Sequence, residues 1–129
     1  MLNCPCGTNK PYERCCRLYH EGQLPKTALQ LMRSRYSAYA LNLPKYIIAT
    51  THPDHPNYHS NHDLFAEEIS AFSETTQFVG LEILGFEERG NMATVTFTAH
   101  LIQNGKKIEL KEKSLFKKVK GAWLYLKSL

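Results

Sequence analysis

The cysteines of this chain are confined to one short segment near its start. Four cysteines lie between positions 4 and 16, in the order Cys-x-Cys-x₈-Cys-Cys, and the rest of the 129 residues contain none. The segment has too few sizeable apolar residues to form a hydrophobic core, so a bound metal is expected to replace that core. Four thiolates form the tetrahedral set that zinc takes in closed structural sites. The spacing therefore predicts one zinc ion, with iron as the alternative metal, bound by Cys4, Cys6, Cys15 and Cys16.

Disulfide bonds or free thiols are the alternative interpretations of the four cysteines. A bridge between the neighbours Cys15 and Cys16 would be strained, which argues against one of the three possible connectivities. His20 lies close in the sequence and is a spare donor. Four thiolates around Zn²⁺ carry a net charge of about −2. Basic side chains in or beside the loop are expected to offset it: Lys10, Arg14 and Arg17.

Composition and charge are those of an ordinary globular protein. The longest apolar runs are only a few residues, so no membrane insertion is expected. The N-terminus lacks the basic and apolar regions of a secretory signal, and a cytoplasmic location, where thiols stay reduced, is therefore expected. The formal net charge is +4, and residues 101–129 alone contain eight lysines. This asymmetry can mark a surface for a polyanion, although a solvated surface is its more usual meaning.

The middle of the chain predicts three helices. The first, over 27–41, begins at a capping-box signal formed by Thr27 and Gln30. The second is short and covers about 44–51. The third follows a polar loop rich in His, Pro and Asn, and Ser60 is expected to cap it.

The remainder of the chain predicts a sheet, because its hydrophobic period changes to two. Strands are expected at 78–88, 92–103, 106–119 and 122–127. Two-residue turns set the register of the last three strands, so that Phe97 faces Glu112 and Phe116 faces Tyr125. Strands longer than the usual five to six residues are expected to bend around the helices. The predicted fold class is α+β: a Cys₄ knuckle at 1–24, and a cone-shaped domain of about three helices on a bent four-stranded antiparallel sheet at 25–129.

One face of this sheet is predicted to be apolar, and it includes Leu110, but Glu112 and Ser114 are polar intruders on it. A carboxylate there is costly unless it is paired. Arg35 lies beside the apolar stripe of the first helix, so it is expected to reach inward and pair with Glu112. This arrangement predicts either an ion pair in an ordinary core or a candidate pocket lined by Arg35, Tyr36, Tyr39, His52, Glu112, Ser114 and Trp123.

The opposite face of the sheet is predicted to be wet and basic. Lysines of the last hairpin lie on it, and the aromatic side chains are expected on the core face instead. A few apolar side chains also point to the wet face, which indicates a covered patch or a homodimer contact: Leu115, Val119, Leu124 and Leu126.

The sequence resembles a known family at several points. The segment from Cys4 to Cys16 resembles the SEC-C metal-binding motif. Positions 28–39, Thr51-His52-Pro53, and the terminal block from Ser114 to Tyr125 resemble the YchJ-like bacterial family. The resemblance implies a SEC-C knuckle before a domain similar to nuclear transport factor two, and it implies no established reaction. Many members carry a second SEC-C motif at the C-terminal end, which these residues lack, and the family's usual tryptophan is replaced at Thr51 and at Phe78.

These observations together predict a metal-binding module for a protein partner or a small-molecule ligand. An enzyme that uses Glu112 or His52 as acid or base is the first alternative. Nucleic-acid or ribosome binding through the basic C-terminal hairpin is the second.

Overall fold

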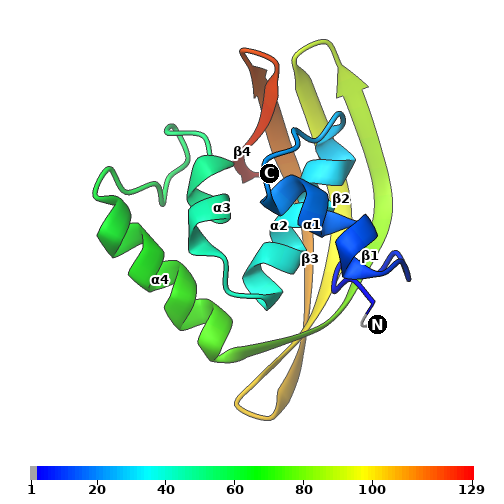
Figure 1. The fold of residues 1–129 in the computed structure, drawn as a ribbon, viewed down its shortest axis with the longest axis vertical. Coiled ribbons are helices and arrows are strands. Elements are labelled where there is room, and N and C mark those ends of the chain that lie inside the picture. The colour runs from blue at the N-terminus through cyan, green and yellow to red at the C-terminus, as the bar shows by residue number, and fades with distance from the viewer. Residues whose placement is uncertain (1–2) are drawn as a thin grey trace.

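The computed structural model describes residues 3–129, in which four α-helices and four strands form an α+β fold (Figure 1). A short 3₁₀ helix and a first α-helix follow the cysteine loop: η1 at Tyr12–Arg14 and α1 at Cys16–His20. The other helices are α2 (Ala28–Ala40), α3 (Pro44–Ala49) and α4 (His62–Glu74). The strands are β1 (Thr76–Arg89), β2 (Met92–Gln103), β3 (Lys106–Val119) and β4 (Ala122–Ser128). The predicted fold class is confirmed, and none of the helices within 3–129 is long and apolar enough to cross a membrane.

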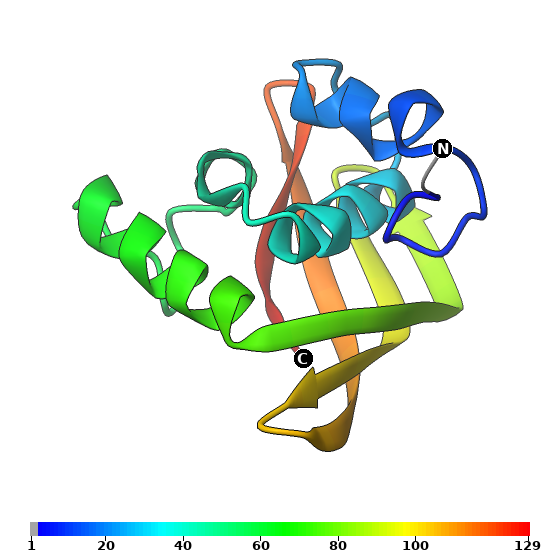
Figure 2. The ribbon, with the colours of Figure 1, turned by 60° about the horizontal axis from the view of Figure 1, so that its bottom comes forward.

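The strands form one antiparallel sheet in the order β1-β2-β3-β4, so each strand pairs with its neighbour in the sequence. The two-residue turns produce the expected register, in which Phe97 pairs with Glu112 and Phe116 with Tyr125. Two irregularities interrupt the pairing of β1 with β2, and such bulges bend a strand and increase its twist. The sheet therefore curves around the helices that cover one of its faces (Figure 2).

The helix boundaries follow hydrogen bonds in their first turns. The Thr27 hydroxyl accepts a hydrogen bond from the Gln30 amide at 3.1 Å, as the capping signal predicts for α2. Pro44 occupies the first turn of α3. Backbone N–H groups in a first turn have no partner within the helix, so the missing N–H of proline costs no hydrogen bond there. The cap predicted for α4 is wrong by one residue: Asn61, not Ser60, accepts hydrogen bonds from the amides of the first turn.

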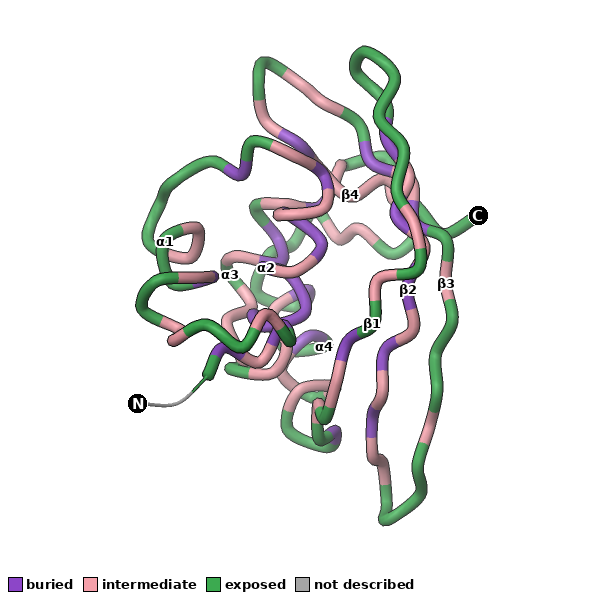
Figure 3. The backbone as a smooth tube through the Cα atoms, turned by 90° about the vertical axis from the view of Figure 1, so that its right-hand side faces the viewer, coloured by how far each residue is buried: buried purple, intermediate pink, exposed green. Residues whose placement is uncertain are grey.

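Helix α2 lies at the centre of the molecule, between the sheet and the N-terminal segment. Met32 and Tyr36 pack into the main core with residues of β2 and β3. On the other side of the helix, Ser34 and Ser37 are fully buried beneath α1 and α3. Figure 3 shows buried residues along α2 and the facing strand β2. The knuckle is thus packed on the same helix that covers the main core.

The β2–β3 hairpin extends beyond the helices at its turn (Figure 3). Leu110 pairs with Ala99 and shares its face of the sheet, as the register predicts. Ala99 is 4% exposed, however, whereas Leu110 is 44% exposed. The expected core position of Leu110 is therefore corrected: it faces the core side but lies where the helices no longer cover the sheet.

Candidate metal centre and ligand cavity

The four cysteine side chains converge on one point. Their Sγ atoms all lie within 4.8 Å of one another, with 3.5 Å between Cys6 and Cys15 and 4.0 Å between Cys15 and Cys16. Zinc with Zn–S bonds of about 2.3 Å needs tetrahedral sulfur atoms about 3.8 Å apart. A disulfide bond of about 2.05 Å is far shorter, and all four cysteines are free thiols. The donor set therefore fits a tetrahedral metal ion better than it fits disulfide bonds.

A tight loop brings the first two cysteines to this point. The Cys4 amide donates a hydrogen bond to the Lys10 carbonyl at 2.8 Å, which closes the loop. Gly7 has a φ of +88°, a left-handed conformation that glycine adopts without strain. A Cβ atom at Gly7 would lie 3.2 Å from the Leu81 carbonyl oxygen. The loop is therefore packed directly against β1.

The crowding of the thiols shifts their pKa values in opposite directions. The pKa of Cys6 is strongly lowered, because the thiols of Cys16 and Cys4 hydrogen-bond to its thiolate. The pKa of Cys16 is raised by its hydrogen bonds with Cys4 and Cys6 and by its burial. A divalent cation favours the thiolate at every ligand. Metal binding at this cluster is therefore expected to release protons.

Two side chains hold the knuckle on helix α2. The Arg33 Nη1 group donates a hydrogen bond to the Cys6 carbonyl at 2.7 Å. His20 lies between Ser34 and Tyr12, with Nε2 2.8 Å from the Ser34 carbonyl and Nδ1 2.7 Å from the Tyr12 hydroxyl. A carbonyl only accepts, so Nε2 carries the proton and Nδ1 accepts from the hydroxyl. His20 therefore ties the knuckle to α2 and is not placed as a spare metal ligand.

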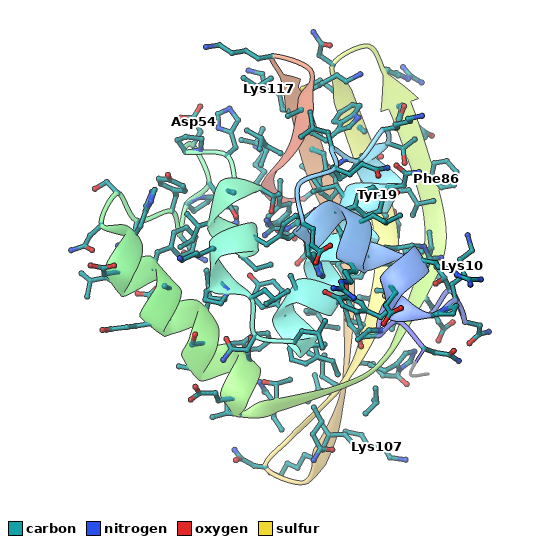
Figure 4. The ribbon with its side chains drawn as sticks, in the orientation of Figure 1. Lys10, Tyr19, Asp54, Phe86, Lys107 and Lys117 are labelled. Carbon is teal, nitrogen blue, oxygen red and sulfur yellow. The ribbon has the colours of Figure 1, made fainter. Side chains whose placement is uncertain are left out.

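The basic side chains expected to offset the charge of the cluster behave differently from one another. Arg17 forms ion pairs with Glu13 and Glu21, one helical turn away on either side, at 3.7 and 3.0 Å. Its predicted role is therefore corrected. Lys10 and Arg14 line a hollow beside the cysteines, and Figure 4 shows Lys10 in the N-terminal loop of the knuckle.

Replacing His20 with alanine is expected to lower stability by about 1–3 kcal/mol, because the Ser34 carbonyl and the Tyr12 hydroxyl both lose a partner. Burial lowers the pKa of His20 below its ordinary value of 6.5, so the unfolded chain takes up a proton at a higher pH than the folded chain does. The contribution of neutral His20 is therefore complete above about pH 6.5, and it decreases as the pH falls towards the lower folded-state pKa.

Melting temperatures of the metal-loaded protein and of His20→Ala, measured at about pH 7.5 and about pH 5.5, check this prediction. The difference in melting temperature between the parent and His20→Ala should be smaller at the lower pH. His59→Ala is the control, because its side chain is 42% exposed and its loss should change stability by no more than about 0.5 kcal/mol. A gap that stays constant or widens on acidification would contradict the role assigned to His20.

A cavity of about 200 Å³ lies between helices α2 and α4 and the concave face of the sheet. Its walls are mostly apolar and aromatic: Met32, Tyr36, Tyr39, Phe72, Phe78, Phe97, Ala99, Leu101, Leu110 and Tyr125. The polar part of the lining consists of Arg35, Glu112 and Ser114. The structure thus brings together five of the residues predicted for the pocket: Arg35, Tyr36, Tyr39, Glu112 and Ser114.

The expected ion pair between Arg35 and Glu112 is not formed. The Arg35 side chain is buried, and its Nη1 group donates to the Ile47 carbonyl and to the hydroxyls of Thr50 and Thr51. The three distances are 3.1, 2.8 and 3.0 Å. Uncharged oxygens at the end of α3 therefore hold the guanidinium group before it can reach Glu112. The sequence prediction failed here because these acceptors come from a different helix.

Glu112 is also held by uncharged groups. Its Oε2 atom accepts hydrogen bonds from the Ser114 hydroxyl and, at 3.1 Å, from the Tyr125 hydroxyl. The guanidinium carbon of Arg35 lies 4.8 Å from the centre of the Tyr125 ring. Burial, followed by the nearby Glu112 carboxylate, raises the pKa of Tyr125, so its hydroxyl stays protonated. Tyr125 therefore contacts both charged groups of the cavity.

Two residues predicted for the pocket lie elsewhere. The His52 amide donates to the Tyr125 carbonyl at 2.8 Å, next to a bridge between Thr51 and β4. Side chains alternate along extended backbone, so Thr51 faces inward while the His52 ring accepts a hydrogen bond from the Asp54 amide at 3.0 Å. Trp123 belongs to the main core and lines a separate hollow beside the knuckle. Both predictions of a position in the cavity are therefore corrected.

Two residues beside Arg35 were missed by the sequence analysis. Tyr125 was placed on the core face, but its pairing with Phe116 puts it four residues along β3 from Glu112, so the register alone did not mark the two as neighbours. His55 lies with its ring centre 5.0 Å from that of Tyr125 and lines a second hollow that shares Arg35 with the cavity. No local pattern predicts the path of the loop that carries His55.

Two solved structures resemble this chain over both the cysteine knuckle and the larger α+β domain. A SEC-C motif containing protein from Rhodopseudomonas palustris is 35% identical, with a TM-score of 0.84 over 99% of this chain and 98% of its own. A SEC-C motif containing protein from Psychrobacter arcticus is 30% identical, with a TM-score of 0.81 over 98% of this chain and 81% of its own. The fold and the cysteine cluster thus define a SEC-C motif protein.

The family follows from two further comparisons. The model described as "YchJ, middle NTF2-like domain" matches residues 27–128. A UPF0225 protein from Vibrio parahaemolyticus is 36% identical over 125 residues, which is 96% of this chain and 72% of that relative. The chain belongs to the YchJ-like family, and its larger domain is NTF2-like. The domain boundary between residues 24 and 25 stays a prediction.

Proposed function

We propose that this protein is a small-ligand-binding module whose cysteine knuckle holds one structural zinc ion. The observation that carries the proposal is an apolar cavity lined by two charged side chains, Arg35 and Glu112, that do not pair with each other. A mostly apolar pocket with a few convergent polar groups is the usual form of a small-molecule site. The cavity therefore supports ligand binding more strongly than it supports a simple packed core.

The metal has a structural role in this proposal. Four protein ligands leave no open coordination position for a substrate or a water molecule. The knuckle contacts β1 at Gly7 and α2 through Arg33 and His20. Metal binding would therefore order the N-terminal segment on the ligand-binding domain. Thiolate ligands also favour a reducing, cytoplasmic location, and elemental analysis would distinguish zinc from iron.

The alternative functions have weaker support. Glu112 lines the cavity and has the position of a possible acid or base, but His52 is outside it. Figure 4 shows Lys107 near the β2–β3 turn and Lys117 towards the opposite end of β3. Both lysines lie on the face of the sheet that is turned away from the core. Phe116 and Trp123 lie on the core side, so they cannot stack on the bases of a nucleic acid bound to the lysine face. Enzyme activity and nucleic-acid binding therefore stay predictions.

Protein partners and a homodimer also stay predictions. The apolar side chains expected at a covered patch or dimer contact are each half-buried: Leu115, Val119, Leu124 and Leu126. Partial burial within one chain weakens the physical reason for a second copy to cover them.

Filling the cavity is expected to abolish ligand binding. Ala99 lines the cavity, and Thr98 precedes it on the opposite face of β2. Ala99→Leu should occupy part of the cavity, while Thr98→Leu adds a larger side chain outside it and serves as the matched control. Both variants should remain folded, since overpacking costs about 1–3 kcal/mol and adjacent empty space reduces that cost.

Amide NMR spectra recorded with compact uncharged compounds, such as indole and p-cresol, measure the effect. We expect shifts at residues lining the cavity in the parent and in Thr98→Leu, and their loss in Ala99→Leu. Amide shifts that are scattered over the surface, or that persist unchanged in a folded Ala99→Leu, would contradict the proposed function.

A further inference from the structure

The guanidinium group of Arg35 is buried without a carboxylate partner. Arg35 is 6% exposed, and none of the ion pairs formed within residues 3–129 includes it. An arginine side chain stays protonated and carries five N–H donors. The described hydrogen bonds of Arg35 all use Nη1. The donors on Nε and Nη2 are therefore left for another acceptor, and Arg35 lines the cavity.

The carboxylate of Glu112 has a matching surplus of acceptors. Its described hydrogen bonds, from Ser114 and Tyr125, both reach Oε2. Within residues 3–129, no donor is bonded to Oε1 in the structure. Glu112 lines the same cavity as Arg35. One wall therefore offers an unused acceptor while another offers unused donors.

The architecture keeps these two charges from neutralising each other. Thr50 and Thr51 hold the guanidinium group from one side, and Tyr125 is in contact with both charged groups. Opposite charges in a poorly solvated site attract strongly when they can approach. Their separation here is therefore a consequence of separate anchors.

The rest of the cavity fits a compact apolar body. Phe72 and Phe78 pack edge to face with ring centres 5.7 Å apart, and Tyr39 packs on both rings. The cavity volume of about 200 Å³ corresponds to about six or seven water molecules, at roughly 30 Å³ each. A ligand of that size has room for a short hydrocarbon side chain and two charged groups.

We infer that the cavity binds a small α-amino acid with an apolar side chain, its carboxylate on Arg35 and its ammonium group on Glu112. This inference rests on the proposed function and names the ligand class of that same site. A monocarboxylate would leave Glu112 without an oppositely charged partner, and an amine would leave Arg35 without one. An unpaired charge in a desolvated site is costly. A zwitterion satisfies both groups and leaves the net charge of the cavity at zero.

Matched ligands test the two charged contacts separately. The metal-loaded full chain is titrated in an amide NMR or calorimetric experiment with glycine, valine, leucine, methionine and phenylalanine. Leucine is then compared with 4-methylpentanoate, which lacks the ammonium group, and with 3-methylbutylamine, which lacks the carboxylate. We expect leucine or another apolar member of the panel to bind, and loss of either charged group to weaken binding about tenfold to a hundredfold.

Glu112→Gln assigns the ammonium contact, because it keeps the shape of the side chain and removes its charge. In this variant the preference for leucine over 4-methylpentanoate should disappear. Arg35→Lys should reduce the preference for leucine over 3-methylbutylamine, because a lysine ammonium group cannot reproduce the guanidinium geometry. The melting temperature of each variant checks that it is folded.

Several results would overturn the inference. These are equal binding of leucine and 4-methylpentanoate, an unchanged preference in folded Glu112→Gln, or no binding of any amino acid in the panel. If uncharged compounds still bind in an Ala99→Leu-sensitive manner, the ligand-binding function stands and only the zwitterion assignment is rejected. If those compounds also fail, both are rejected.

Discussion

Removing the metal ion proposed for the knuckle is expected to unfold residues 3–24 while the sheet stays folded. Cys4, Cys6 and Cys16 form a buried cluster of their own, and within the described chain the partly buried hydrophobic residues packed against it are Tyr12 and Cys15 alone. Structural zinc in small domains has an apparent binding free energy of about 10–16 kcal/mol at neutral pH. The hydrogen bonds from α2 are worth only about 0.5–3 kcal/mol each. They are therefore too weak to keep the segment ordered without the metal.

Elemental analysis of freshly purified protein should find about one zinc or iron ion per chain. Chelation, or Cys6→Ser, should remove the ion. Amide exchange should then show lost protection in residues 3–24 and retained protection in β2 and β3. Tyr39→Phe is the control, since it alters the cavity and leaves the cysteines intact. Full protection of the knuckle after chelation, or disulfides in a thiol titration, would refute the metal site.

Replacing Phe116 with alanine is expected to destabilise the protein by about 3–5 kcal/mol. Phe116 is 0% exposed, and its ring centre lies 5.6 Å from that of Tyr125. Removing its ring would leave a void that the surrounding strands and α2 cannot fill without moving. Phe86 is the matched control, because it lies on the same face of the same sheet but is 60% exposed. Phe86→Ala should cost no more than about 0.5 kcal/mol.

Denaturant unfolding of the two metal-loaded variants provides the measurement. The midpoint for Phe116→Ala should fall well below that of the parent, with an unchanged dependence on denaturant concentration. Phe86→Ala should unfold close to the parent. Similar losses for the two variants would show that the packing described here does not determine stability.

The contrast between these two phenylalanines shows where sequence patterns lose information. Phe86 pairs with Val95, and Phe116 pairs with Ala93, so the alternation of side chains places both on the core face. Val95 and Ala93 are buried, but Phe86 belongs to an edge strand (Figure 4). The register determines which way a side chain points. It does not determine whether another element covers it.

The cavity shows the same division in its chemistry. The sequence predicted that Arg35 and Glu112 would lie near each other, because helical spacing and strand pairing place both on inward faces. It did not predict that Thr50 and Thr51 would bind the guanidinium group or that Tyr125 would contact both charges. These contacts depend on how α3 and β4 pack against α2. Neither helix periodicity nor turn type determines that packing.

By itself, the sequence determined the cysteine cluster, helices α2, α3 and α4, the four strands, and the register of the last three strands. Those features depend on short-range rules: ligand spacing, caps, two-residue turns and periodic side-chain direction. Only the tertiary structure decided that His20 ties α1 to α2, that His52 and Trp123 lie outside the cavity, and that Arg35 and Glu112 stay apart. Each of these outcomes depends on competition among partners from distant segments, which becomes possible only when the helices are packed on the bent sheet.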